Sequence, residues 1–139
     1  MANDDINFPV NGYIPPAIPD GDHYQVVLLR AEQSSHWGGK IYLWFQMITP
    51  GEWHGKEFYM ACPVAPKGRW KPSHKYWLMW VLAAGEQPTR TDRISTAVFR
   101  NKVFRVRMRK VLKTAKQTDR TPAQQYSVVD VLLEVLVGR

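Results

Sequence analysis

Between Lys102 and Leu112 the chain alternates between apolar and cationic side chains. The even-numbered positions include the apolar residues Phe104, Val106, Met108 and Leu112. The odd-numbered positions include the cations Arg105, Arg107 and Arg109. A period of two is typical of a β-strand, because successive side chains of an extended chain point to opposite faces. The segment therefore predicts a strand that turns one face to the core and presents a row of guanidinium groups on the other.

Four further segments have the composition of strands. They are His23–Ala31, Lys40–Thr49, Glu57–Cys62 and Tyr126–Val137. Glycine and proline residues between the first three supply turn chemistry, which predicts a three-stranded meander. In the last segment, strict alternation predicts which side chains face inward, namely Val129, Val131, Leu133, Val135 and Val137.

One helix is predicted between the third and fourth strands. Ser73 stands at an N-cap position, apolar residues recur with helical spacing from Tyr76 to Ala84, and Gly85 is a C-terminal stop. We expect Trp77 and Trp80 to be core residues of this helix. The order strand, strand, strand, helix, strand, strand predicts an all-β fold with one helix, a five-stranded OB-type barrel. A half-open α+β sheet with the helix on one face is the alternative.

Length and composition indicate a single domain. Residues 1–22 are rich in proline and glycine, which predicts an extended arm, and residues 23–139 are predicted to form the domain. Cys62 is the single cysteine, so no intramolecular disulfide can form, and the acidic start Met1–Asp5 does not resemble an export signal. Since no apolar stretch approaches the roughly 20 residues that span a bilayer, we expect a cytoplasmic protein without a membrane contact.

The charge of the chain favours a polyanionic partner. The formal net charge is +7, and between Lys102 and Arg120 eight basic residues face one acid, Asp119. An ordinary protein surface mixes both signs, so this excess predicts a track for phosphates, with the loop Lys113–Gln125 beside it. The alternative is a solvated strand face, or a charged edge that prevents sheet-to-sheet association.

The sequence also resembles the small OB-fold-like single-stranded-DNA-binding proteins of phages and mobile genetic elements. The resemblance is carried by Pro19–Tyr24, Ile41–Phe45, Pro50–Lys56 and Tyr126–Val131. It implies a barrel that binds single-stranded DNA. The chain lacks the long acidic-tipped tail with which general bacterial single-strand binders recruit partners, so we expect no recruitment role of that kind.

Binding of a single strand without sequence preference requires cations along the backbone and exposed aromatic planes for the bases. We predict that Tyr42, Trp44 and Trp37 stack bases and that Arg105, Arg107, Arg109, Lys113 and Lys116 follow phosphates. Further candidates in or beside loops are Lys40, Trp53, Arg69, Trp70, Lys71 and Arg120. The predicted function is that of a non-enzymatic nucleic-acid-binding protein that prefers single-stranded DNA; RNA, duplex DNA and a homo-oligomeric state stay open.

The sequence offers no catalytic, metal or cofactor motif. Its histidines are scattered, Cys62 has no second cysteine, and no phosphate-binding glycine loop occurs. Asp130 and Glu134, four residues apart on a strand, would stand about 13 Å apart, too far for an acid and base pair. We therefore expect no enzyme and no cofactor. The alternative function is a protein-interaction adaptor or inhibitor of a phage or mobile element that binds an acidic partner.

Overall fold

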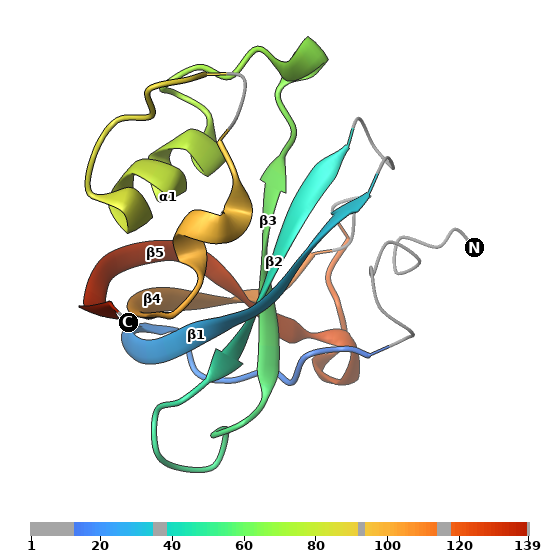
Figure 1. Cartoon of the computed structure of the whole chain (residues 1–139). Helices are drawn as coiled ribbons and strands as arrows, with labels where there is room; N and C mark the ends of the chain where they lie inside the picture. The colour runs from blue at the N-terminus through green and yellow to red at the C-terminus, as the bar shows by residue number, and fades with distance from the viewer. Residues whose placement is uncertain (1–12, 35–38, 92–93, 114–117, 139) are drawn as a thin grey trace.

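A computed structural model describes residues 13–34, 39–91, 94–113 and 118–138. Five antiparallel strands form one sheet in the spatial order β3-β2-β1-β4-β5, and one α-helix follows β3 (Figure 1). The elements are β1 (Gly21–Ser34), β2 (Lys40–Met47), β3 (Glu57–Pro63), η3 (Pro66–Gly68), α1 (Lys75–Ala84), η4 (Thr96–Phe99), β4 (Lys102–Val111), η5 (Pro122–Gln124) and β5 (Tyr126–Gly138). The predicted β-rich fold and element order are confirmed. The sheet is not closed into a barrel, because β3 and β5 are its two edges.

The long strand β1 bends the sheet. Its first part pairs with β4 as far as Val27, opposite Val103, and its second part pairs with β2 from Val26 to Ser34. As a result β4 and β5 run across the molecule while β2 and β3 run upright (Figure 1). Beyond Val27, β1 pairs with β2 but has no strand on its other edge among the described residues.

The strand β5 departs from the predicted alternation. Its register with β4 shifts at three places, and each shift leaves one extra residue on β5: Asp130, Leu133 and Leu136. Such bulges change which side chains face inward. Leu132 is therefore buried in place of Leu133, and Val137, predicted to face inward, is exposed. Leu112, predicted for the inner face of the preceding strand, lies beyond its end and is also exposed.

The core lies between the sheet and α1. The helix buries Tyr76, Trp77 and Met79, as its spacing predicted, and ends at Gly85, whose φ of 78° is left-handed. Its N-cap is His74 rather than Ser73. Trp80 is half-buried against the core, and its indole N–H donates to the carbonyl of Ser95 at 3.0 Å.

The predicted domain boundary at residue 22 is corrected by the packing of the preceding segment. Ile18 is fully buried and belongs to the core, Pro15 is buried, and Gly21 already pairs with Met108 of β4. Residues 15–22 therefore belong to the folded domain. The remainder of the predicted arm, residues 1–12, lies outside the described residues.

Burial of Cys62 predicts a loss of stability at alkaline pH. Burial on β3 raises the pKa of its thiol to about 11. Well below pH 8 the thiol is protonated in both states. Between pH 9 and 11 the unfolded chain releases the proton first, so about 2 to 3 kcal/mol of stability should be lost.

The measurement is urea unfolding between pH 8 and 10.5 for the protein and for Cys62→Ala. The variant should start less stable and show a flatter decline above pH 9. Buried Tyr59, whose pKa is also raised by burial, adds a common loss above pH 10 in both proteins. Parallel declines between pH 9 and 10 would contradict the assignment to Cys62.

Candidate nucleic-acid interface

Tyr42 and Trp44 are not open to a ligand. They lie on the face of β2 opposite the core, as predicted, yet their side chains are 5% and 0% exposed. With Tyr59, Tyr126 and Val128 they form a second apolar cluster, which we call the outer cluster. The prediction that these two rings present free faces is therefore wrong for this conformation.

Two charged side chains of β1 help to cover Trp44. The guanidinium of Arg30 lies 4.8 Å from the Trp44 ring centre, and the indole N–H donates to Glu32 at 3.1 Å. Arg30 also pairs with Glu57 at 3.1 Å. The sequence pattern of β2 alone could not show this cover, because it comes from β1 and β3.

The arginine row of β4 is partly neutralised by the neighbouring strand. Arg105 pairs with Glu134 at 2.6 Å and Arg109 with Asp130 at 2.9 Å. Arg107 is exposed and makes no ion pair within the described part of the chain. Surface ion pairs of this kind contribute little to stability, but they lower the net positive charge that the row offers to a phosphate. The expectation of an unpaired row is thus corrected for Arg105 and Arg109.

The loop after β4 makes contacts within itself and with the outer cluster. Lys113 forms an ion pair with Asp119, and the hydrogen bond from Lys113 lowers the pKa of that carboxyl. Arg120 donates to the carbonyl of Lys113 at 3.1 Å, and its guanidinium lies 5.2 Å from the ring centre of Tyr126. Lys116 lies outside the described residues.

The connection between β3 and α1, residues 64–74, is basic and contains no acid. From Phe58 to Gly85 the sequence contains no acid. Lys67, Arg69 and Lys71 are exposed and make no ion pair among the described residues. We call residues 64–74 the basic loop. Arg69 and Lys71 were predicted as site residues, whereas Lys67 was missed although the absence of acids was visible in the sequence.

Trp70 gives the basic loop a fixed aromatic side chain. It is half-buried, with its ring 5.0 Å from that of Tyr76 and 5.8 Å from that of His74. The nitrogen Nδ1 of His74 accepts from the backbone N–H of Lys71 at 3.1 Å, which orders the loop. One part of Trp70 therefore packs on the core while another part remains accessible beside cations.

A hollow between the two sheet edges lies between the start of α1, where the basic loop ends, and Arg109 of the arginine row. Its volume is about 140 Å³, and its lining includes Lys75 at the start of α1 and Arg109 of β4. The aromatic side chains in its wall are Tyr59 and Tyr126 of the outer cluster. We call the line Lys67, Arg69, Lys71, Lys75, Arg109 and Arg107 the cationic path.

The remaining predicted residues do not all join this path. Lys40 lies opposite Pro63, at the end of β3 from which the basic loop leaves. Trp53 lies in the turn before β3, at the strand's other end, and packs half-buried against the core. Trp37 lies outside the described residues. The structure therefore brings Lys40, Arg69, Trp70 and Lys71 to one end of the sheet and separates Trp53 from them.

Comparison of the chain with protein-family models, with curated proteins and with solved structures finds no match. Within the described residues no helix is long and apolar enough to cross a membrane. The same part of the chain contains no group of three or more histidine, cysteine, aspartate or glutamate residues that could hold a metal ion.

Proposed function

We propose that this protein is a non-enzymatic nucleic-acid-binding protein that holds single-stranded DNA along the cationic path. The observation that carries the proposal is the hollow lined by Lys75 and Arg109, which lies between the start of α1, directly after the basic loop, and the arginine row. Phosphates would follow the cations, and Trp70 would offer a partly open ring to a base. A binding site of this kind would not select sequence strongly, because stacking accepts any base.

The fold proposed for this function is an OB-type barrel that is open between β3 and β5. Its support is the element order, the long bent β1 that pairs with both β2 and β4, and the approach of the two edges. Across the open seam the hydroxyl of Tyr59 donates to that of Tyr126 at 3.3 Å. OB-type barrels bind oligonucleotides across strands 2 and 3 and adjoining loops, which is where the outer cluster lies.

The test is a matched pair of double variants, each of which removes two positive charges. Arg69→Ala/Lys71→Ala changes the cationic path, whereas Lys56→Ala/Arg100→Ala changes exposed cations elsewhere. Fluorescence anisotropy with a labelled single strand of about 30 nucleotides gives the affinity at several salt concentrations. The path variant should bind about tenfold more weakly, and its salt slope should fall by about 1.4, at roughly 0.7 per lost phosphate contact.

The control variant should lose much less affinity, because its two cations lie outside the cationic path although its net charge falls by the same amount. Equal losses of affinity in the two variants would show that binding depends on net charge and not on position. The assignment of the binding site to the cationic path would then be wrong. Absence of binding to single strand, duplex and RNA at low salt would reject the nucleic-acid function altogether.

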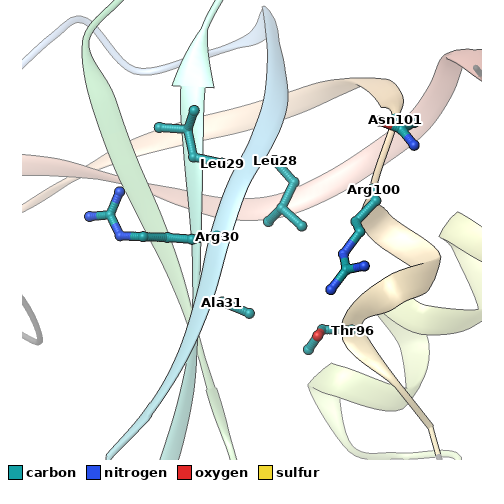
Figure 2. Close-up of a pocket in the computed structure, with 7 residues that line it drawn as sticks. All are labelled: Leu28, Leu29, Arg30, Ala31, Thr96, Arg100 and Asn101. Carbon is teal, nitrogen blue, oxygen red and sulfur yellow. The ribbon is translucent and has the colours of Figure 1, made fainter.

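A specific cavity favours the adaptor as the second candidate function. About 470 Å³ lies between β1 and the segment from η4 to β4, lined in part by Leu28, Ala31, Thr96 and Arg100. Figure 2 shows the side chains of Arg100 and Thr96 one above the other, on the side of their segment that faces β1. This part of β1 lies beyond Val27, the last residue that pairs with β4. Among the described residues this edge of β1 has no strand neighbour and Arg100 makes no ion pair, an arrangement that suits an extended acidic peptide that adds to the sheet.

The two functions differ in what copurifies with the protein at low salt. A nucleic-acid binder should carry nucleic acid, visible in its ultraviolet absorbance ratio and removed by a high-salt wash. An adaptor should carry no nucleic acid, and its partner should be lost on Arg100→Glu while Arg69→Ala/Lys71→Ala leaves it bound.

A further inference from the structure

The outer cluster is a row of aromatic rings that crosses three strands. Tyr59 of β3 lies at its centre, with ring centres 5.3 Å from Tyr42 and 5.1 Å from Trp44, and 6.4 Å from Tyr126 of β5. The sheet does not need these rings for its main core, which lies on the opposite face. Rings on this face of a β-sheet are the kind of platform on which successive bases stack.

Both ends of the row already hold a flat cationic group. Arg30 lies over Trp44, and Arg120 lies over Tyr126. A guanidinium over a ring occupies a plane similar to that of a stacked base. Arg30 also pairs with Glu57 at 3.1 Å and with Glu32 at 3.5 Å, so a phosphate at the Trp44 end would have to displace these carboxylates. The rings therefore carry the cation and aromatic combination that a single strand requires.

The described chain before β1 covers the Trp44 end of this row. Tyr13 packs edge-on against Trp44 with ring centres 6.0 Å apart, and its hydroxyl donates to the carbonyl of Glu57 at 3.1 Å. Ser127 anchors the same segment farther along: it accepts from the N–H of Ile18 at 2.9 Å and donates to the Ile18 carbonyl at 3.2 Å.

The cover is firmly held at one end and weakly at the other. Ile18 is part of the core, whereas Tyr13 is 37% exposed and Ile14 is 55% exposed. Residues 13–20 form no strand, so few backbone hydrogen bonds oppose their displacement. The anchored part extends to Pro15, which is buried, and to Pro16, whose carbonyl accepts from the backbone N–H of Ser127 at 3.1 Å, so Tyr13 can leave while the chain from Pro15 onward stays in place.

We propose that the outer cluster is a second base-stacking site for single-stranded nucleic acid and that Tyr13 competes with the bases for the Trp44 ring. The inference rests on the proposed function. Tyr126 at one end of the row and Tyr59 at its centre line the hollow beside Lys75, although both are largely buried, so a strand on the cationic path would pass this part of the row first. Bases then reach Trp44 when Tyr13 moves away.

The experiment compares Tyr13→Ala with Ile14→Ala, an exposed neighbour in the same segment. The probe is a labelled oligothymidylate of about 30 nucleotides, followed by anisotropy and by tryptophan quenching. A site that is open for a fraction of the time has its affinity reduced by that fraction, so removal of the competitor should raise affinity, here by about fivefold. Ile14→Ala should leave the affinity unchanged, and thermal melting should show both variants folded.

Tryptophan quenching identifies Trp44 as the ring on which the bases stack. The additional quenching in Tyr13→Ala should disappear when Trp44 is also changed to Phe. An unchanged or weakened affinity in Tyr13→Ala, while the Arg69 and Lys71 variant still weakens binding, would overturn this inference alone. Failure of both the full protein and Tyr13→Ala to bind would instead remove the proposed function and the second site with it.

Discussion

Replacement of Trp44 by alanine is expected to lower the free energy of unfolding by about 3 to 5 kcal/mol. The side chain is fully buried, although it lies on the sheet face opposite the main core. Its removal leaves a cavity beside Tyr59, frees the guanidinium of Arg30 and deprives Glu32 of its indole donor. Chemical denaturation monitored by far-ultraviolet circular dichroism measures the change.

Leu78→Ala serves as the matched control, because Leu78 is a large apolar side chain that α1 exposes. It should change stability by less than about 1 kcal/mol. A loss at Trp44 as small as that at Leu78 would show that the outer cluster is open in solution and that residues 13–18 do not cover it. The same variant should weaken binding of a single strand if the second stacking site is real.

The strands and the helix could be predicted because their patterns are local. Phe104, Val106 and Met108 alternate with arginines, and all three lie in the core. The helical spacing of Tyr76 and Met79 likewise predicted the buried side of α1. Such patterns report which face of an element is apolar, and each needs a window of about ten residues.

Partners from distant segments could not be predicted in the same way. Arg105 and Arg109 lie in a stretch of β4 that contains no acid, so the row looked unpaired until β5 supplied Glu134 and Asp130. Trp44 looked exposed because the cover contributed by Tyr13 is 31 positions away in the chain. In both cases the side chain faces the predicted side, and what fills that side depends on tertiary pairing.

The residue types of the candidate interface could be predicted from the sequence, but their arrangement on the surface could not. Arg69, Trp70 and Lys71 stood out as aromatic and cationic neighbours. Lys67 and Lys75 were not predicted, although the lack of acids around them was visible in the sequence. Their continuity with Arg109 was not visible, since α1 and β4 approach each other solely through the fold. The approach of Lys75 to Arg109 is therefore a property of the seam between β3 and β5.

Leu132→Ala is expected to lower the free energy of unfolding by about 2 to 5 kcal/mol, whereas Leu133→Ala should cost about 1 kcal/mol or less. Strict alternation from Val129 would give the opposite order, because it places Leu133 inside. The register shift after Arg105 makes Leu133 the extra residue, so Leu132 faces Val106 and packs in the core. The backbone N–H of Leu132 also donates to the sulfur of Met79 on α1 at 3.2 Å.

The two leucines are adjacent and identical, so helix or strand propensity cannot explain a difference between them. Denaturant midpoints of the two variants compare their burial directly. A larger loss for Leu133 would mean that β5 pairs with β4 without the bulge, which would also move Glu134 away from Arg105 and alter the charge of the arginine row. The curvature of β5 and the electrostatics of the proposed binding surface therefore depend on the same register.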